Sequence, residues 1–278
     1  GRWLEAGYGD FSATFPAEIY EIGIPPAYSM ETADVVMLKG DTVCAFSEEE
    51  LKSILSGAIY MDGKSHAHLC RMGMSALTGF ETGKTLERDC IELFETHELN
   101  GEIQGRRRDA RQSFWHESAV ELIPASDKAE ILSSIVNYEE ERIAPACMGV
   151  FENALGGRIC VSGYAPWSFL QSGSKSSQMK SVFRWLTRDG LPAYVSSYHK
   201  ICIWVRRTID HSIGIVVLNA SHDEATSVRL NVLATGTEAR LTHVDLAEQT
   251  ATPIGKDSGY TVFEIPRLEA WQICLFEA

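Results

Sequence analysis

The sequence of 278 residues lacks three features that would mark a membrane, nucleic-acid-binding or disulfide-bonded protein. It has no apolar run close to the ~20 residues that a membrane helix needs. Its formal net charge is −13, so it offers no basic excess for nucleic-acid phosphates. Its seven cysteines are scattered without C-x-x-C spacing, and most stand in apolar stretches where a free thiol behaves as a small hydrophobe. We expect no membrane or nucleic-acid partner, no disulfide framework and no zinc site.

The amino terminus also lacks features. The chain begins Gly1-Arg2-Trp3, without a Met and without the basic and apolar segments of a secretory signal. A start without Met suggests that the chain was cut from a longer one. Unpaired cysteines favour a reducing compartment, so a cytoplasmic location is favoured.

One basic run stands out against the acidic background. Arg106, Arg107 and Arg108, with Arg111, are followed by acidic residues. We interpret the run as a solvated loop. The alternative is a patch that binds an anion or a partner.

Strands and helices alternate between residues 33 and 73. The apolar runs 33–38 and 58–61 are typical of buried strands. Between them, Ser47 and Glu50 have the spacing of a capping box, which predicts the start of a helix. A second helix is expected over 65–72. Strands and helices joined by short links predict a parallel sheet.

The stretch 149–169 connects the two parts of the chain. Gly156 and Gly157 suit a tight turn, and one of them should hold a positive φ. The apolar run 158–162 predicts a short strand with Ile159, Cys160 and Val161 buried. We interpret this stretch as structural. The alternative is that Glu152, which stands beside the turn, has a functional role. Three aromatic residues are expected to cover the strand end: Tyr164, Trp167 and Phe169.

Residues 80–145 alternate like half-exposed strands, which suggests an antiparallel insertion. An amphipathic helix is expected over 175–188. After it the sequence predicts only strands, at about 193–198, 200–206, 213–219, 226–233, 239–245, 260–265 and 271–276. Seven short strands of this spacing are typical of a β-sandwich. After the helix the apolar residues change from a helical period of about 3.6 residues to a strand period of about 2. This change places a domain boundary near Leu191 and Pro192, giving domains 1–191 and 192–278.

A hydrolase or amidotransferase would need a Ser or Cys on a sharp turn after a strand. The best such turn is Asp62-Gly63-Lys64-Ser65, where Asp62 or Gly63 holds the nucleophile position and Ser65 is displaced into the helix. Two glycine pairs, Gly7/Gly9 and Gly79/Gly83, lack the strand and helix context of a phosphate loop.

Metal chemistry is weakly indicated. His66 and Cys70 lie one helical turn apart and could share an ion, whereas His66 and His68 point away from each other. No further ligand is spaced to join His66 and Cys70, so packing is the favoured interpretation.

Carbohydrate chemistry has candidates of its own. Glu152, Asp62 and Asp41 stand near predicted strand ends, and paired carboxylates can hydrolyse glycosides. Asn219-Ala220-Ser221 is a glycosylation sequon. Three tryptophans could stack on sugar rings, although packing is favoured for each: Trp115, Trp167 and Trp204.

The order of parts resembles a known family. A strand at 34–38 leads to a Ser-capped helix and a strand at 58–62; FENALGGRICVSGY, an amphipathic helix and a sandwich containing IGIVVLNA follow. This order resembles the C-terminal half of glycoside-hydrolase-like proteins related to the family-42 β-galactosidases. In them a TIM barrel precedes a trimerisation domain of the class I glutamine amidotransferase-like fold, and then a small β-sandwich.

The resemblance implies an α/β fold: a flavodoxin-like or class I glutamine amidotransferase-like parallel sheet with an insertion at about 80–145, followed by an all-β sandwich. It implies that the catalytic glutamates lie on a barrel outside this chain. No catalytic, cofactor-binding or metal-binding residue is therefore assigned. The implied partners are the missing N-terminal barrel, further copies of the chain and a carbohydrate bound by the parent protein.

Three functions follow. The first is a non-catalytic accessory or assembly fragment of a carbohydrate-active protein. The second is a small α/β hydrolase or amidotransferase-like enzyme that uses Ser65 or Cys70. The third is a carbohydrate-binding module that uses exposed aromatic residues.

Overall fold

The computed structural model describes residues 19–27, 29–87, 90–110, 118–164, 172–207, 212–233, 238–244 and 247–278. These residues form eighteen strands in four sheets. The chain divides into two compact units, each described by itself below. Of the described residues, those within 35–164 and 177–186 belong to the first unit, and those within 19–34, 172–176 and 187–278 belong to the second. No helix in the described ranges is long and apolar enough to span a membrane.

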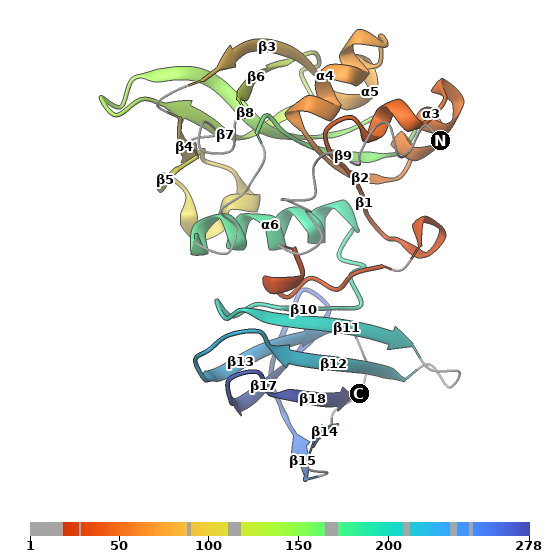
Figure 1. The fold of residues 1–278 in the computed structure, drawn as a ribbon, viewed down its shortest axis with the longest axis vertical. Coiled ribbons are helices and arrows are strands. Elements are labelled where there is room, and N and C mark those ends of the chain that lie inside the picture. Colours follow the sequence, from red (N-terminus) through yellow and green to blue (C-terminus); the bar gives the residue numbers. More distant parts are fainter. Residues whose placement is uncertain are drawn as a thin grey trace. The chain divides into compact units, whose positions relative to one another are not determined.

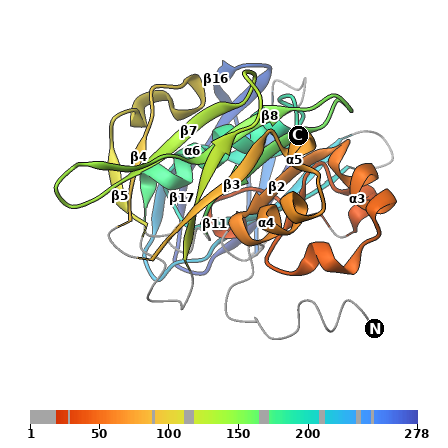
Figure 2. The same ribbon diagram turned by 90° about the horizontal axis from the view of Figure 1, so that it is seen from above.

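A seven-stranded sheet forms the first unit (Figure 2). Its order is β1 (Val36–Leu38), β2 (Ala58–Asp62), β9 (Arg158–Ser162), β8 (Arg142–Glu152), β7 (Glu130–Val136), β4 (Ile91–Phe94) and β5 (Arg107–Asp109). The strands β1, β2 and β9 run parallel, and every pair from β9 to β5 is antiparallel. A separate pair joins β3 (Phe80–Leu86) to β6 (Ala119–Pro124).

Helices cover both faces of the parallel strands. Successive residues of a strand face opposite sides. Ile59 and Met61 pack in the same cluster as residues of α3 (Glu48–Leu55) and α4 (Gly63–Arg71). On the other face the Tyr60 ring lies 5.9 Å from the Phe183 ring of α6 (Gly173–Leu186). Figure 1 shows α4 and α6 on opposite sides of the sheet. The shorter helices are η1 (Met30–Thr32), η2 (Thr42–Ala45), α5 (Ser75–Thr78) and η3 (Glu98–Ile103).

Local signals explain where α3 begins. The Ser47 side chain accepts a hydrogen bond from the Glu50 amide, and the Glu50 carboxylate accepts one from the Ser47 amide, 2.7 Å away. This reciprocal arrangement satisfies two amides that a helix start leaves without partners. The predicted capping box is confirmed.

The turn before β9 is built on Asn153. Its side-chain nitrogen donates to the carbonyls of Leu55 (2.8 Å) and Leu77 (3.0 Å), and its oxygen accepts from the amide of Gly157 (3.0 Å). Gly156 holds a φ of 82°, and a Cβ on Gly157 would lie 2.0 Å from the Leu55 oxygen. The predicted positive φ is confirmed.

The strand that follows the turn is buried as predicted. Ile159, Cys160 and Val161 are fully buried between β2 and β8. Tyr164 is buried as well. Trp167 and Phe169, the other members of the predicted aromatic cover, lie outside the described residues.

The prediction of a flavodoxin-like or class I glutamine amidotransferase-like α/β fold is wrong. Strands hold more of the described residues than helices do, and only β1, β2 and β9 are parallel. The segment 80–145 is not a separate insertion, because β4, β5, β7 and the start of β8 extend the same sheet through antiparallel pairs. After α4 and α5 the pairs β4/β5, β7/β8 and β8/β9 are antiparallel, so the parallel pattern stops at three strands.

Two sheets pack face to face in the second unit. One has the order β10 (Ala193–Val195), β13 (Ala225–Val232), β17 (Tyr260–Leu268) and β16 (Pro253–Asp257). The other has the order β11 (Ile201–Arg207), β12 (Ile213–Asn219), β18 (Ile273–Glu277), β14 (Ala239–His243) and β15 (Glu248–Ala251). The strands β15 and β16, rich in charged and small residues, are absent from the sequence-based prediction.

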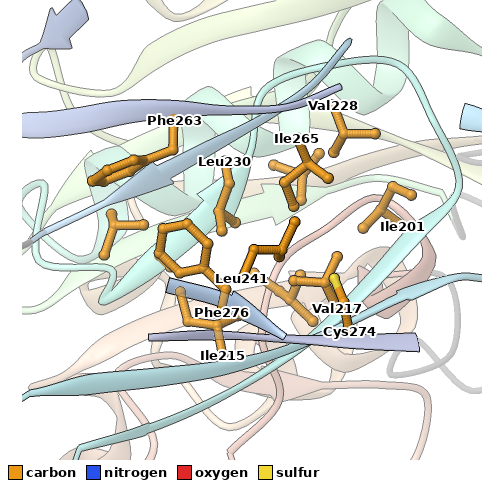
Figure 3. Close-up of a cluster of buried hydrophobic side chains, with 14 of the residues drawn as sticks. Ile201, Ile215, Val217, Val228, Leu230, Leu241, Phe263, Ile265, Cys274 and Phe276 are labelled. Carbon is orange, nitrogen blue, oxygen red and sulfur yellow. The ribbon is translucent and has the colours of Figure 1, made fainter. Parts of the chain in front are cut away.

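Alternate residues of these strands fill one core. Leu230, Phe263 and Ile265 from the first sheet meet Ile215 and Phe276 from the second (Figure 3). The Phe263 and Phe276 rings lie 5.0 Å apart at 69°, an edge-to-face contact. The second unit is therefore a β-sandwich. A domain boundary at residues 191 and 192 stays a prediction.

Candidate functional site

The carboxyl ends of β1 and β2 meet at one edge of the sheet, since the two strands are parallel and adjacent. The turn η2 follows β1 there, and α4 begins there after β2. In open sheets with parallel strands, this edge is the usual place for ligands. The loops at this edge are therefore the expected position of a ligand site.

Asp62 ties the two loops together. Its carboxylate caps α4 by accepting from the Ser65 amide (2.8 Å), and both of its oxygens accept from the Gly40 amide (3.1 and 2.9 Å). Burial raises the pKa of Asp62, although the hydrogen bonds from Ser65 and Gly40 oppose the rise. Ser65 is fully buried and its hydroxyl donates to the Gly40 carbonyl (3.0 Å). Both side chains hold the backbone in place, which leaves Ser65 unsuited to act as a nucleophile.

Asp41, Cys44 and His68 come together just outside this framework. His68 Nε2 lies 2.7 Å from Asp41 Oδ1, and Cys44 Sγ lies 3.6 Å from His68 Nδ1. The three potential ligand atoms all lie within 4.8 Å of one another. Cys44 is exposed, while the side chains of Asp41 and His68 are partly exposed. We call these three residues the Asp41–Cys44–His68 cluster.

Two cations flank the cluster. Lys64 Nζ donates to Asp41 Oδ2 at 2.8 Å, and Arg71 Nη2 lies 2.7 Å from His68 Nδ1. Burial alone would raise the pKa of Asp41, but hydrogen bonds from Lys64 and His68 outweigh it, so the pKa is lowered. Asp41 is therefore a carboxylate near neutral pH. The contacts assign the His68 ring proton to Nε2, which donates to Asp41, and leave Nδ1 to accept from Arg71.

The sequence-predicted pair His66 and Cys70 is in contact but is built for packing. Cys70 Sγ lies 3.3 Å from His66 Nε2, which itself donates to the Phe80 carbonyl at 3.0 Å. His66 is fully buried, and burial lowers its pKa. Within the described part of the chain no third ligand joins this pair, since the Asp41–Cys44–His68 cluster is the one group with metal-binding spacing.

Glu152 and Asp62 do not form a catalytic pair. Glu152 is level with Arg158 and Ala58, at the opposite end of β2 from Asp62. A strand rises about 3.3 Å per residue, so about 13 Å of strand separates the two positions. Glu152 also pairs with Arg158, Nε to Oε2, at 2.9 Å. Acid and base groups in glycosidases lie closer together, at about 5–9.5 Å.

The arginine run is only partly a solvated loop. Arg107 is exposed and pairs with Glu140, whereas Arg108 is buried in β5 and donates to Glu92 at 2.5 Å. The interpretation as a solvated loop is therefore wrong for Arg108, because the alternation of β5 turns that side chain inward. Arg111 and Trp115, like the Gly7 and Gly9 pair, lie outside the described residues.

A second candidate lies on the outer face of the five-stranded sheet. A shallow hollow of about 340 Å³ is lined by Trp204, Arg206, Gly214, Val216 and Leu275. Trp204, Val216 and Leu275 are neighbours across β11, β12 and β18. Gly214 of β12 pairs with Arg206 on one side and with β18 on the other. Because it has no side chain, it leaves room for the hollow above the sheet. The Trp204 indole beside the Arg206 guanidinium suits a ring-shaped polar ligand.

The sequon is not an acceptor in this structure. Asn219 is fully buried, and its side-chain nitrogen donates to the carbonyls of Asp223 (2.8 Å), Leu268 (3.2 Å) and Glu269 (3.0 Å). Its role is to hold the end of β12 against the end of β17.

Comparison with known proteins identifies the fold. No protein-family model matches the chain, and no curated protein sequence does. Among solved structures, the α-L-fucosidase isoenzyme 2 from Paenibacillus thiaminolyticus matches 93% of this chain at 12% identity, with a TM-score of 0.58. The match covers 44% of the fucosidase, so this chain spans less than half of its length. At this identity the likeness shows a shared fold.

Two weaker matches carry no structural argument. A cycloisomaltooligosaccharide glucanotransferase from a Paenibacillus species covers 37% of this chain and 20% of its own length, at 15% identity and a TM-score of 0.23. A Bacteroides fragilis protein described as an α-galactosidase/melibiase covers 39% and 23%, at 19% identity and a TM-score of 0.19. The chain thus shares its fold with part of a glycoside hydrolase, and nothing here points to family 42 specifically.

Proposed function

We propose that this chain is a non-catalytic accessory part of a larger glycoside-hydrolase-like protein. One observation carries the proposal: almost the whole chain matches a fucosidase structure, yet the match accounts for less than half of that enzyme. The chemistry of the described residues agrees with it. Asp62 is engaged as a helix cap, and Glu152 lies in an ion pair at the opposite edge of the sheet.

The proposal includes the partners that such a part requires. A catalytic barrel belonging to the same protein and further copies of the chain are the expected partners. A carbohydrate is the expected substrate of the parent protein. These remain proposals that rest on the shared fold.

A hydrolysis assay tests the accessory role. The purified chain is incubated with nitrophenyl fucoside, galactoside, glucoside and xyloside, and we expect no release of nitrophenol above a protein-free control. The complete reading frame is expected to encode a catalytic segment that hydrolyses one of them. Turnover by this chain that Glu152→Gln or another single carboxylate substitution abolishes would overturn the proposal.

The hollow beside Trp204 favours carbohydrate binding as a second function. A sugar ring offers an apolar face to an aromatic ring and hydroxyl groups to charged side chains, and Trp204 and Arg206 supply both beside the gap at Gly214. We expect calorimetry with galacto- and xylo-oligosaccharides to detect binding that Trp204→Ala removes. Trp271→Ala is the matched control, because Trp271 is 55% exposed and does not line the hollow. Binding that survives Trp204→Ala would contradict this assignment.

A further inference from the structure

We propose that Asp41, Cys44 and His68 bind one zinc ion at the carboxyl edge of β1 and β2. The three side chains supply a carboxylate oxygen, a sulfur and an imidazole nitrogen from two segments about 24 to 27 residues apart in sequence. The proposal is independent of the accessory role, which assigns no metal to this chain.

The separations suit a tetrahedral ion. Zinc bonds of about 2.0–2.3 Å place neighbouring ligand atoms about 3.3–3.7 Å apart. Asp41 Oδ1 and His68 Nε2 are 2.7 Å apart, and Cys44 Sγ is 4.0 Å from the same nitrogen. The first distance must lengthen and the second must shorten, each by less than about 1 Å. The side chains are partly exposed, so both changes need only small rotations.

The backbone that carries the ligands is already held. The amide of Cys44 donates to the Asp41 carbonyl (2.9 Å), and the amide of Lys39 donates to the Thr42 hydroxyl (3.0 Å), which fixes η2. Asp62 joins the loop before η2 to the first turn of α4 through the Gly40 and Ser65 amides. Asp41 directly before η2, Cys44 on η2 and His68 on α4 are therefore held by backbone segments that are hydrogen-bonded to each other.

The flanking cations have different parts in binding. Lys64 contacts Oδ2 of Asp41 and leaves Oδ1 for the ion, so it can keep the carboxylate oriented while the metal is bound. Arg71 contacts Nδ1 of His68 and must move. Coordination through Nε2 transfers the ring proton to Nδ1, and the Cys44 thiol releases its proton to solvent as the sulfur binds.

The ligand types select the ion. A thiolate and an imidazole are preferred by zinc and similar transition metals, whereas magnesium and calcium take oxygen ligands. Three protein ligands leave the fourth position open to water or another small ligand, as in catalytic rather than structural zinc sites. The competing interpretation is a surface ion-pair network, which would stabilise the fold by at most about 1 kcal/mol and would bind no metal.

Metal titration of the purified, chelator-treated chain distinguishes the two. Calorimetry should show one zinc per chain, and cobalt in its place should give a thiolate-to-metal charge-transfer absorption. Cys44→Ser and His68→Ala should lose both signals, and Lys64→Met should weaken binding by about tenfold. Cys70→Ser is the matched control, since Cys70 also stands beside a histidine but lies outside the cluster; it should bind zinc as the wild type does.

Alkylation provides a readout without substitution. Iodoacetamide labelling followed by peptide mass spectrometry should show that zinc slows modification of Cys44 and leaves that of Cys70 unchanged. Circular dichroism of each variant confirms that it is folded. The proposal is overturned by the absence of zinc binding, by binding that persists in folded Cys44→Ser and His68→Ala, or by binding that Cys70→Ser removes.

Discussion

Replacement of Gly157 by alanine should be among the most damaging single-methyl additions in the first unit. The added Cβ would lie 2.0 Å from the Leu55 oxygen and 2.9 Å from the Gly57 oxygen. Both oxygens are backbone atoms with partners: Leu55 accepts from the Asn153 side chain at 2.8 Å, and Gly57 accepts from the Arg158 amide at 3.0 Å. Neither can retreat by the necessary ångström without breaking a hydrogen bond.

The magnitude follows from these contacts. Overpacking a fixed site costs about 1–3 kcal/mol, and loss of a buried hydrogen bond adds about 1 kcal/mol. We expect Gly157→Ala to lower the free energy of unfolding by about 2–4 kcal/mol. For a unit of this size, that corresponds to a fall in melting temperature of roughly 4–16 °C.

Two neighbouring substitutions separate the causes. Gly156 has a φ of 82° and open space around it, so Gly156→Ala should cost about 1–2 kcal/mol through backbone strain alone. Glu152→Gln removes a partly exposed ion pair with Arg158 and should cost at most about 1 kcal/mol. Thermal unfolding of the three variants by circular dichroism gives the order. A cost of Glu152→Gln equal to or above that of Gly157→Ala would refute the argument from backbone geometry.

Three more predictions concern the first unit. Asn153→Ala should cost about 3 kcal/mol in urea unfolding, since it leaves the buried Leu55 carbonyl and the partly buried Leu77 carbonyl without their donor; a loss below 1 kcal/mol would contradict this. Arg108→Leu should cost about 3–5 kcal/mol because it removes the cation that pairs with the buried Glu92 carboxylate, and the double variant with Glu92→Met should be more stable than that single variant. Burial lowers the pKa of His66, so the unfolded state binds more protons below about pH 6.5 and stability falls as pH decreases there. His66→Gln should flatten that fall between about pH 7 and pH 5, and an unchanged pH profile would count against it.

Local structure could be predicted from the sequence where one short segment contains all the determinants. The Ser47 capping box needs only its own helix turn, and the burial of Ile159 follows from an unbroken apolar run. The course of the sheet could not be predicted in this way. Alternating segments after residue 80 are compatible with an insertion or with further strands of the same sheet, and the choice depends on pairings such as Glu92 with Ile135.

The candidate sites show the same limit. His66 and Cys70 have metal-ligand spacing because they are one helical turn apart, but both side chains contact the Phe80 carbonyl instead. Cys44 and His68 are 24 residues apart and meet because η2 bends toward α4. Arg108 resembles its solvated neighbours in sequence, and only its place in β5 turns it to Glu92.

The pairing of β2 has a consequence for how the chain is made. One edge of β2 is covered by β1, which precedes it closely, but the other pairs with β9, where Ala58 meets Arg158 one hundred residues later. During synthesis from the amino end, that edge stays open until the hairpin of β8 and β9 has emerged, and an open apolar strand edge is a site for pairing with other chains. The parallel and antiparallel parts of the sheet are thus joined in one late event, the insertion of β9. A nascent chain that stalls before residue 158 carries β2 with one side open to pairing with another chain.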